Sequence, residues 1–237
     1  MTGVLKNGAA MKLHEQLRDT SRPSIVAAYT VPTPLARVRP RITAKHLLFF
    51  LLALAVLFVL YHNERFVLHR DSGTWKYFYP VRWTLLVHVF GGATALLAGP
   101  LQFSTRLRER RPALHHLIGY LYMSGVLVGA STAAYLGLTH AMFPLETIVQ
   151  AALWVFTTAM ALLAVRNQNF EIHRQWMMRS YAVTLIFVVS RVLLALPILA
   201  SITNPGAERV LWILNLGALL VPQIIINWRQ LFTRPSR

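Results

Sequence analysis

The sequence predicts an all-α integral membrane protein, a helical bundle of about six transmembrane helices. Hydrophobic residues make up 55% of the 237 residues and charged residues 14%. The mean hydropathy is +0.48, and both values lie far from those of soluble domains. Six stretches approach or exceed the roughly 20 apolar residues with which a helix crosses a bilayer. These predicted spans are 46–62, 82–103, 115–138, 146–165, 177–200 and 208–227.

The basic residues are distributed as the positive-inside rule describes. With both termini in the cytoplasm, 18 of the 24 Lys and Arg residues fall on the cytoplasmic side and 5 on the opposite, outer side. The acidic residues divide evenly, as the rule also expects. The formal charge of +16 therefore reflects topology and attraction to anionic lipid headgroups at the cytoplasmic face. We expect no nucleic-acid partner.

The segments outside the bundle, which is predicted to cover 46–230, are basic. Residues 1–45 contain four prolines and eight basic residues without sustained periodicity, which predicts a disordered cytoplasmic tail. Residues 231–237 are predicted to form a second basic cytoplasmic tail. Apart from an aromatic-rich outer loop at 61–82, the connections are short, so consecutive spans are expected to be antiparallel neighbours.

The second span carries a histidine on a stripe of small residues. His88 is followed by Gly91, Gly92, Ala95 and Gly99 at helical offsets. Small residues on one stripe allow another helix to approach closely. His88 is therefore expected to point into the bundle, at a depth within the hydrocarbon.

Further histidines mark the two ends of the third span. His115 and His116 lie at its start, and His140 follows His115 by 25 residues. At 1.5 Å rise per residue this separation is about 37 Å. These histidines are therefore expected to serve two levels of the bundle, one near each surface.

The fifth span carries the most unusual residue, Arg191, in the middle of the apolar run 177–200. A guanidinium at that depth costs roughly 2.5–3.5 kcal/mol on insertion scales, so a partner, a ligand or a wet cavity is expected. If the helix already includes His173, both residues fall on one stripe with Ser180 and Thr184.

These placements predict two sets of side chains supplied by the second to fifth spans. The outer set is His88, Arg191 and His140, and the inner set is His115, His116, His173 and Arg174. Each of these side chains also has an explanation that involves no ligand. The histidines at the ends of spans can lie in the headgroup layer, and His88 can form a hydrogen bond to a neighbouring helix. Arg191 can pair with a carbonyl, Glu146 or Glu208.

Several chemistries are excluded or disfavoured by composition. The chain has no cysteine, which excludes disulfides, thiolate metal sites, iron–sulfur clusters and covalent c-type haem. It has only eight acidic residues, and none is expected inside a span. Paired carboxylates for hydrolysis or a di-iron centre are therefore not expected.

The string His173-Arg174-Gln175-Trp176-Met177-Met178-Arg179-Ser180-Tyr181-Ala182 resembles the "HRxWMxRS" box of a bacterial membrane protein family, domain of unknown function 2306. The segment Gly92–Gln102 resembles that family's "GxxALxxGPxQ" stretch. His115–Tyr122 resembles its "HRxxGRxY" box, although both arginines of the box are absent here. The resemblance covers roughly residues 80–230. It implies a multi-span protein of the bacterial cytoplasmic (inner) membrane and no particular reaction.

The function predicted from these residues is b-type haem binding with electron transfer between a membrane or quinone donor and an acceptor. Histidines on facing helices can supply both axial ligands while arginines neutralise the propionates. His115 with His173 would form the inner pair and His88 with His140 the outer pair, assisted by Arg174 and Arg191. One alternative is a small-solute or proton-coupled transporter that uses the intramembrane Arg and His. Another is a non-catalytic membrane subunit or assembly factor.

Overall fold

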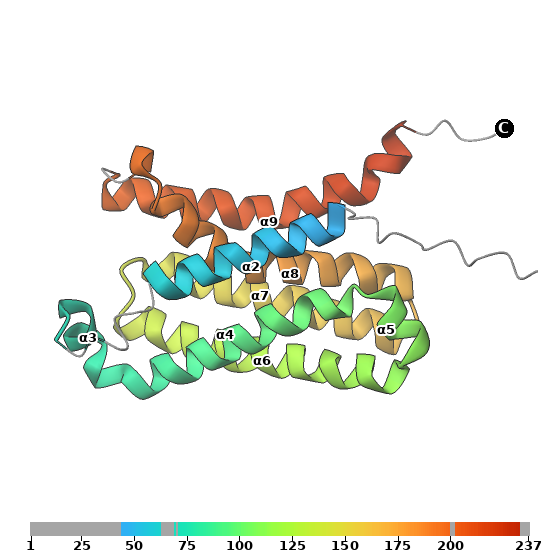
Figure 1. Ribbon diagram of the computed structural model, residues 1–237, viewed down its shortest axis with the longest axis horizontal. Coiled ribbons are helices and arrows are strands. Elements are labelled where there is room, and N and C mark those ends of the chain that lie inside the picture. Colours follow the sequence, from blue (N-terminus) through green and yellow to red (C-terminus); the bar gives the residue numbers. More distant parts are fainter. Residues whose placement is uncertain (1–43, 63–68, 70, 200–201, 233–237) are drawn as a thin grey trace, which may run out of the picture. The chain divides into compact units, whose positions relative to one another are not determined.

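The computed structural model describes residues 44–62, 69, 71–199 and 202–232, and these form an all-α membrane bundle without strands (Figure 1). The predicted tails lie outside the described residues except at their inner ends. The elements in chain order are α2 (Ala44–His62), α3 (Gly73–Phe78), η2 (Tyr79–Val81), α4 (Arg82–Gln102), α5 (Thr105–Arg110), α6 (Pro112–Thr139), α7 (Pro144–Arg166), α8 (Phe170–Leu194), η3 (Pro197–Leu199) and α9 (Asn204–Phe232).

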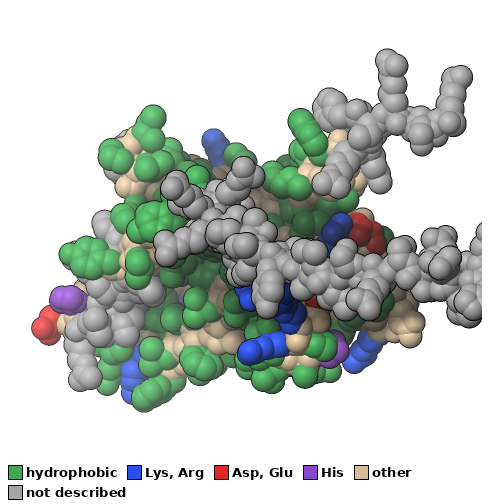
Figure 2. Space-filling model, turned by 45° about the vertical axis from the view of Figure 1, so that its right-hand side comes forward, with side chains coloured by type: hydrophobic (Ala, Val, Ile, Leu, Met, Phe, Trp, Pro, Cys, Tyr) green, Lys and Arg blue, Asp and Glu red, His purple; other side chains and the backbone are tan. Residues whose placement is uncertain are grey.

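Five segments of the described residues are long and apolar enough to cross a membrane. They are Gly73–Gln102, Pro112–Thr139, Pro144–Arg166, Phe170–Leu194 and Asn204–Trp228. The first predicted span corresponds to α2, whose described side chains include the apolar helical stretch Phe49–Val59. Many hydrophobic side chains are exposed on the described part of the face seen in Figure 2, as expected of helices that meet acyl chains.

The fifth span lies several residues earlier in the chain than the hydropathy predicts. Asn169 caps α8, since its side-chain oxygen accepts a hydrogen bond from the backbone N–H of Ile172 at 3.2 Å. The helix ends at Leu194, because Pro197 disfavours helical backbone in the residue before it. His173 is therefore inside the helix, as the stripe required. Arg191, however, stands in the last turn and not in the middle of the span.

Glycines bring the backbones of α4 and α6 into direct contact. A Cβ built on Gly91 would lie 2.8 Å from the backbone nitrogen of Gly129, and one on Gly125 would lie 2.8 Å from the carbonyl oxygen of Gly91. The small-residue stripe predicted this approach. Gly92 is the exception, because a Cβ there would meet nothing within 4 Å.

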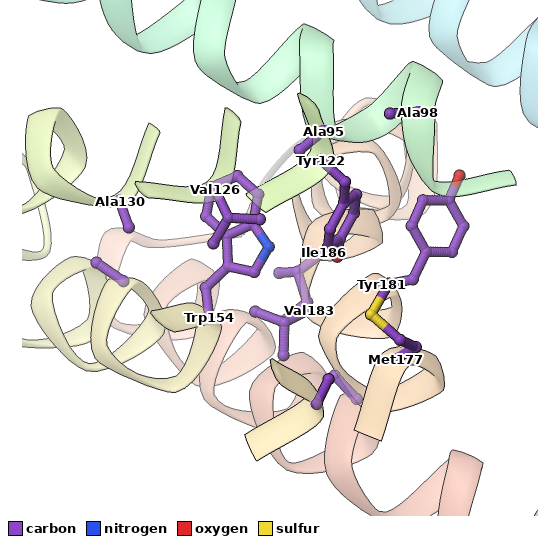
Figure 3. Close-up of a cluster of buried hydrophobic side chains, with 13 residues drawn as sticks. Ala95, Ala98, Tyr122, Val126, Ala130, Trp154, Met177, Tyr181, Val183 and Ile186 are labelled. Atoms are coloured by element: carbon purple, nitrogen blue, oxygen red, sulfur yellow. The ribbon is translucent and has the colours of Figure 1, made fainter. Parts of the chain in front are cut away.

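Large side chains of α6, α7 and α8 fill the centre of the bundle. In Figure 3, Tyr122, Trp154, Val183 and Ile186 point toward one another between these helices, while Tyr181 points toward α4. Tyr122 is fully buried, and Trp154 is 9% exposed. Both rings carry a polar atom, and a buried polar atom requires a partner. Their partners define the site described next.

Candidate functional site

A cluster of hydroxyl groups lies at the centre of the bundle. The Tyr122 hydroxyl is 2.7 Å from that of Ser180 and 3.0 Å from that of Thr184. Ser180 in turn lies 2.7 Å from the hydroxyl of Thr158, and the indole N–H of Trp154 donates to Thr184 at 2.8 Å. We call these five residues the hydroxyl cluster. It joins α6, α7 and α8 by side-chain hydrogen bonds.

Sequence reasoning identified only part of this cluster. Ser180 and Thr184 were placed on the polar stripe of the fifth span, but Tyr122, Trp154 and Thr158 were not singled out. The available signal was the occurrence of hydroxyl and indole groups inside apolar spans, where polar side chains turn toward protein.

The hydroxyl cluster shows how far along the axes of α6 and α8 the two inner histidines lie. His115 precedes Tyr122 by seven residues on α6, and His173 precedes Ser180 by seven residues on α8. Seven residues are almost two full turns, so each histidine lies on the same face about 10 Å nearer the start of its helix. The structure thus brings the predicted inner pair to one level.

The two inner imidazoles differ in their hydrogen bonds. His173 Nδ1 lies 2.8 Å from the carbonyl oxygen of Ala161 on α7. A carbonyl only accepts, so Nδ1 carries the proton and Nε2 keeps its lone pair. The Nδ1 atom of His115 is buried and has no hydrogen-bond partner within the described part of the chain. The two rings thus differ, since His173 is held by a backbone carbonyl and a ring nitrogen of His115 is buried without a hydrogen bond among the described residues.

The other members of the inner set face outward. Arg174 pairs with Glu171 at 3.1 Å, and both side chains are 60% exposed. His116 is exposed beside His115, with ring centroids 6.0 Å apart. Arg179 on α8 is partly buried, and it was not predicted as a site residue. Its guanidinium lies 4.8 Å from the ring of Trp176 and donates to Gln223 on α9.

In the outer set, His88 bridges α4 and α6. Its Nδ1 atom lies 2.9 Å from the carbonyl oxygen of Gly129. The charge of Arg191 acts on this imidazole. The Arg191 side chain is exposed and lies over the ring of Phe187 at 5.5 Å. One turn from the end of α8, a long basic side chain can reach the headgroup layer.

The structure does not bring His140 to His88. His140 caps the end of α6, eleven residues beyond Gly129, or about 16 Å along the helix axis. Its ring lies 5.7 Å from that of Tyr77 on α3. The close contact of α4 with α6 at Gly91 also leaves no room for a planar group between these helices beside His88.

The expectation that no acid lies inside a span is wrong, because the spans of the described residues contain Glu146, Glu171 and Glu208, of which Glu146 is buried. Glu146, in the first turn of α7, is only 2% exposed. Its carboxyl accepts a hydrogen bond of 2.8 Å from the Asn215 amide on α9. Asn215 was not expected to pair with it, because hydropathy does not show which helix faces the carboxyl. Across the described ranges, no group of three or more His, Asp or Glu side chains could hold a metal ion.

Contacts join the three strings that carry the family resemblance. The Tyr181 hydroxyl donates to the carbonyl oxygen of Leu96 at 3.3 Å, and a Cβ on Gly99 would overlap the Tyr181 ring. Gln102 donates through its side-chain amide to the carbonyl oxygen of His115 at 3.1 Å. With the bond between Tyr122 and Ser180, each string contacts the other two.

Comparison with known proteins identifies one family. No curated protein matches the chain, and no solved structure matches it. The family model described as "Predicted membrane protein (DUF2306)" matches residues 85–229, which include all three strings. The match covers more than half of the chain, and its helices are long and apolar enough to cross a membrane. The chain therefore belongs to the DUF2306 family of membrane proteins.

Proposed function

We propose that the chain binds one b-type haem at its predicted cytoplasmic end, with His115 and His173 as axial ligands, and carries electrons between a membrane donor such as a quinone and an acceptor. The observation that supports this proposal is the equivalent placement of the two histidines. Each lies seven residues before a member of the hydroxyl cluster, on α6 and on α8.

The donor atoms fit the proposed ligand. A histidine that binds a metal through one ring nitrogen commonly donates the other N–H to a backbone carbonyl, which fixes the orientation of the ring. His173 makes such a bond to Ala161. His115 has a buried ring nitrogen without a partner among the described residues, and a ligand bond would satisfy it.

The surrounding residues have separate tasks in this proposal. A bound haem supplies one-electron redox chemistry. The hydroxyl cluster holds α6 and α8 in register, and the bond from Gln102 fixes the backbone at His115. Arg108 on α5 places a positive charge whose field reaches His115. It is therefore a candidate to neutralise propionates, a task for which Arg174 is unsuited because it faces outward in an ion pair.

Absorption spectroscopy of the purified protein tests the proposal. The full chain is expressed in cells supplied with a haem precursor and purified in mild detergent. We expect a Soret band that shifts on reduction, and its loss in both His115→Ala and His173→Ala. His116→Ala is the matched control, because that neighbouring ring is exposed, and it should retain the band. Colourless wild-type protein without extractable haem would contradict the proposal, as would spectra that neither variant changes.

A further inference from the structure

The carboxyl of Glu146 is a buried titratable group that the proposed function does not use. Glu146 is 2% exposed and its partner Asn215 is 3% exposed. The Asn215 side-chain nitrogen donates to the Oε1 atom of Glu146 at 2.8 Å and to the carbonyl oxygen of Leu211 at 3.1 Å. This pair connects α7 to α9, two helices that are separated in the chain by α8.

The pair as it stands leaves one polar atom unsatisfied. The Oδ1 atom of Asn215 is buried and has no hydrogen-bond partner among the described residues. An ionised carboxylate cannot supply the missing bond, because it only accepts. A protonated carboxyl carries an O–H donor. A carboxylic acid and a primary amide can then form a cyclic pair, in which N–H donates to one carboxyl oxygen and O–H donates to the amide oxygen.

The surroundings also suit a proton better than a metal cation. The amide N–H of Asn215 is directed at the carboxyl oxygen, where it would repel a cation. A hard cation requires six or more oxygen ligands, and no described cluster of acidic and histidine side chains could hold one. A neutral acid is far less costly than a carboxylate away from water.

The titratable groups at the Glu146 end of the bundle come from three neighbouring segments. At this end of the bundle, the titratable side chains on helices packed against α7 are His140 on α6, Arg191 on α8, and Glu208 and Arg209 on α9. The negative charge of Glu208 acts on the Glu146 carboxyl. A negative charge on Glu146 would therefore be unfavourable, and a proton bound to its carboxyl neutralises that charge.

We propose that Glu146 and Asn215 form a proton-binding site within the bundle. The carboxyl takes up one proton, completes both hydrogen bonds to the amide and thereby holds α7 against α9. Loss of the proton leaves a carboxylate in the electrostatic field of Glu208 and an amide oxygen that lacks a donor. The contact between the two helices is then weakened.

Infrared spectroscopy of the full chain in lipid nanodiscs at neutral pH tests the proposal directly. We expect a carboxylic acid C=O stretching band that shifts in D₂O, because its proton exchanges. The band should be absent in Glu146→Gln and retained in Glu208→Gln, the matched control for a neighbouring carboxyl. Absence of the band in the wild type, or its persistence in Glu146→Gln, would overturn the proposal.

Thermal unfolding gives a second test that does not depend on the band. A Gln at position 146 can form the same two bonds with Asn215, so Glu146→Gln should keep a Tm close to that of the wild type. Glu146→Ala should lower it. Equal losses of Tm in the two variants would count against the proton site. Neither measurement involves haem, so this proposal and the proposed function can fail separately.

Discussion

The hydroxyl oxygen of Tyr122 lies 2.7 Å from that of Ser180, and this contact fixes how far α6 is displaced along its axis relative to α8. Two turns earlier on each helix stand His115 and His173. A slip of one residue between the helices would break the hydrogen bond and rotate one histidine by about 100° away from the other. The hydroxyl cluster thus determines whether the inner pair can share a ligand.

Removal of the Tyr122 hydroxyl should destabilise the bundle. In Tyr122→Phe, Ser180 and Thr184 each lose a buried hydrogen-bond partner, although other bonds of the cluster remain. A hydrogen bond within a protein makes a net contribution of about 0.5–1.5 kcal/mol. A fall in Tm, measured from intrinsic fluorescence in detergent, is therefore expected. Tyr120→Phe is the control, since that ring is 68% exposed, and its Tm should stay near that of the wild type.

Two adjacent glycines should respond differently to the same substitution. Gly91→Ala places a Cβ 2.8 Å from the backbone nitrogen of Gly129, whereas Gly92→Ala places one in open space. Overpacking of this kind costs about 1–3 kcal/mol, while alanine otherwise favours helix. We expect a clear loss of Tm for Gly91→Ala only. Similar Tm values for the two variants would show that α4 and α6 are not in backbone contact at this point.

The contact between Arg179 and Gln223 should behave as a coupled pair. In Gln223→Leu, the partly buried guanidinium loses its acceptor on α9, at a cost of about 1–3 kcal/mol. The additional change Arg179→Met removes the guanidinium that has lost its acceptor, so the double variant should be more stable than Gln223→Leu alone. A double-mutant cycle of thermal unfolding measures the coupling. Strictly additive effects would mean that the two side chains do not interact in the membrane.

The predicted topology can be tested with cysteine labelling, because the natural chain has no cysteine. Met142, 70% exposed between α6 and α7, is predicted to lie outside the cytoplasm. Glu109, exposed on α5, is predicted to lie in the cytoplasm. In intact cells a membrane-impermeant maleimide should label Met142→Cys and not Glu109→Cys, and lysis should allow both to react. The reverse pattern would invert the orientation.

The sequence predicted the helices better than it predicted their ends. Apolar length located each span, because a bilayer requires about 20 apolar residues whichever helices are neighbours. It misplaced the fifth span, since the first turns of α8 are polar and hydropathy does not detect a helix that continues into such residues. The cap at Asn169 and the proline at 197 set its true limits. This shift placed Arg191 near the end of the helix.

The candidate site was predicted in part for a similar reason. Periodicity shows which face of one helix carries a polar group, so it placed His173, Ser180 and Thr184 on a common stripe. It does not show which residue of another helix lies opposite. Periodicity therefore allows a pairing of His88 with His140, whereas the structure places His88 against Gly129 and His140 against Tyr77.

The sequence by itself determined the membrane class, the approximate spans and the small-residue stripe along which α4 approaches α6. These properties depend on local composition and helical periodicity. Only the tertiary structure decided the partners of the buried polar groups, including the bond of Tyr122 to Ser180 across 58 residues and that of Asn215 to Glu146 across 69. The physical reason is that a hydrogen bond requires two atoms within about 3 Å. Residues on different helices reach that distance only when all the helices pack together.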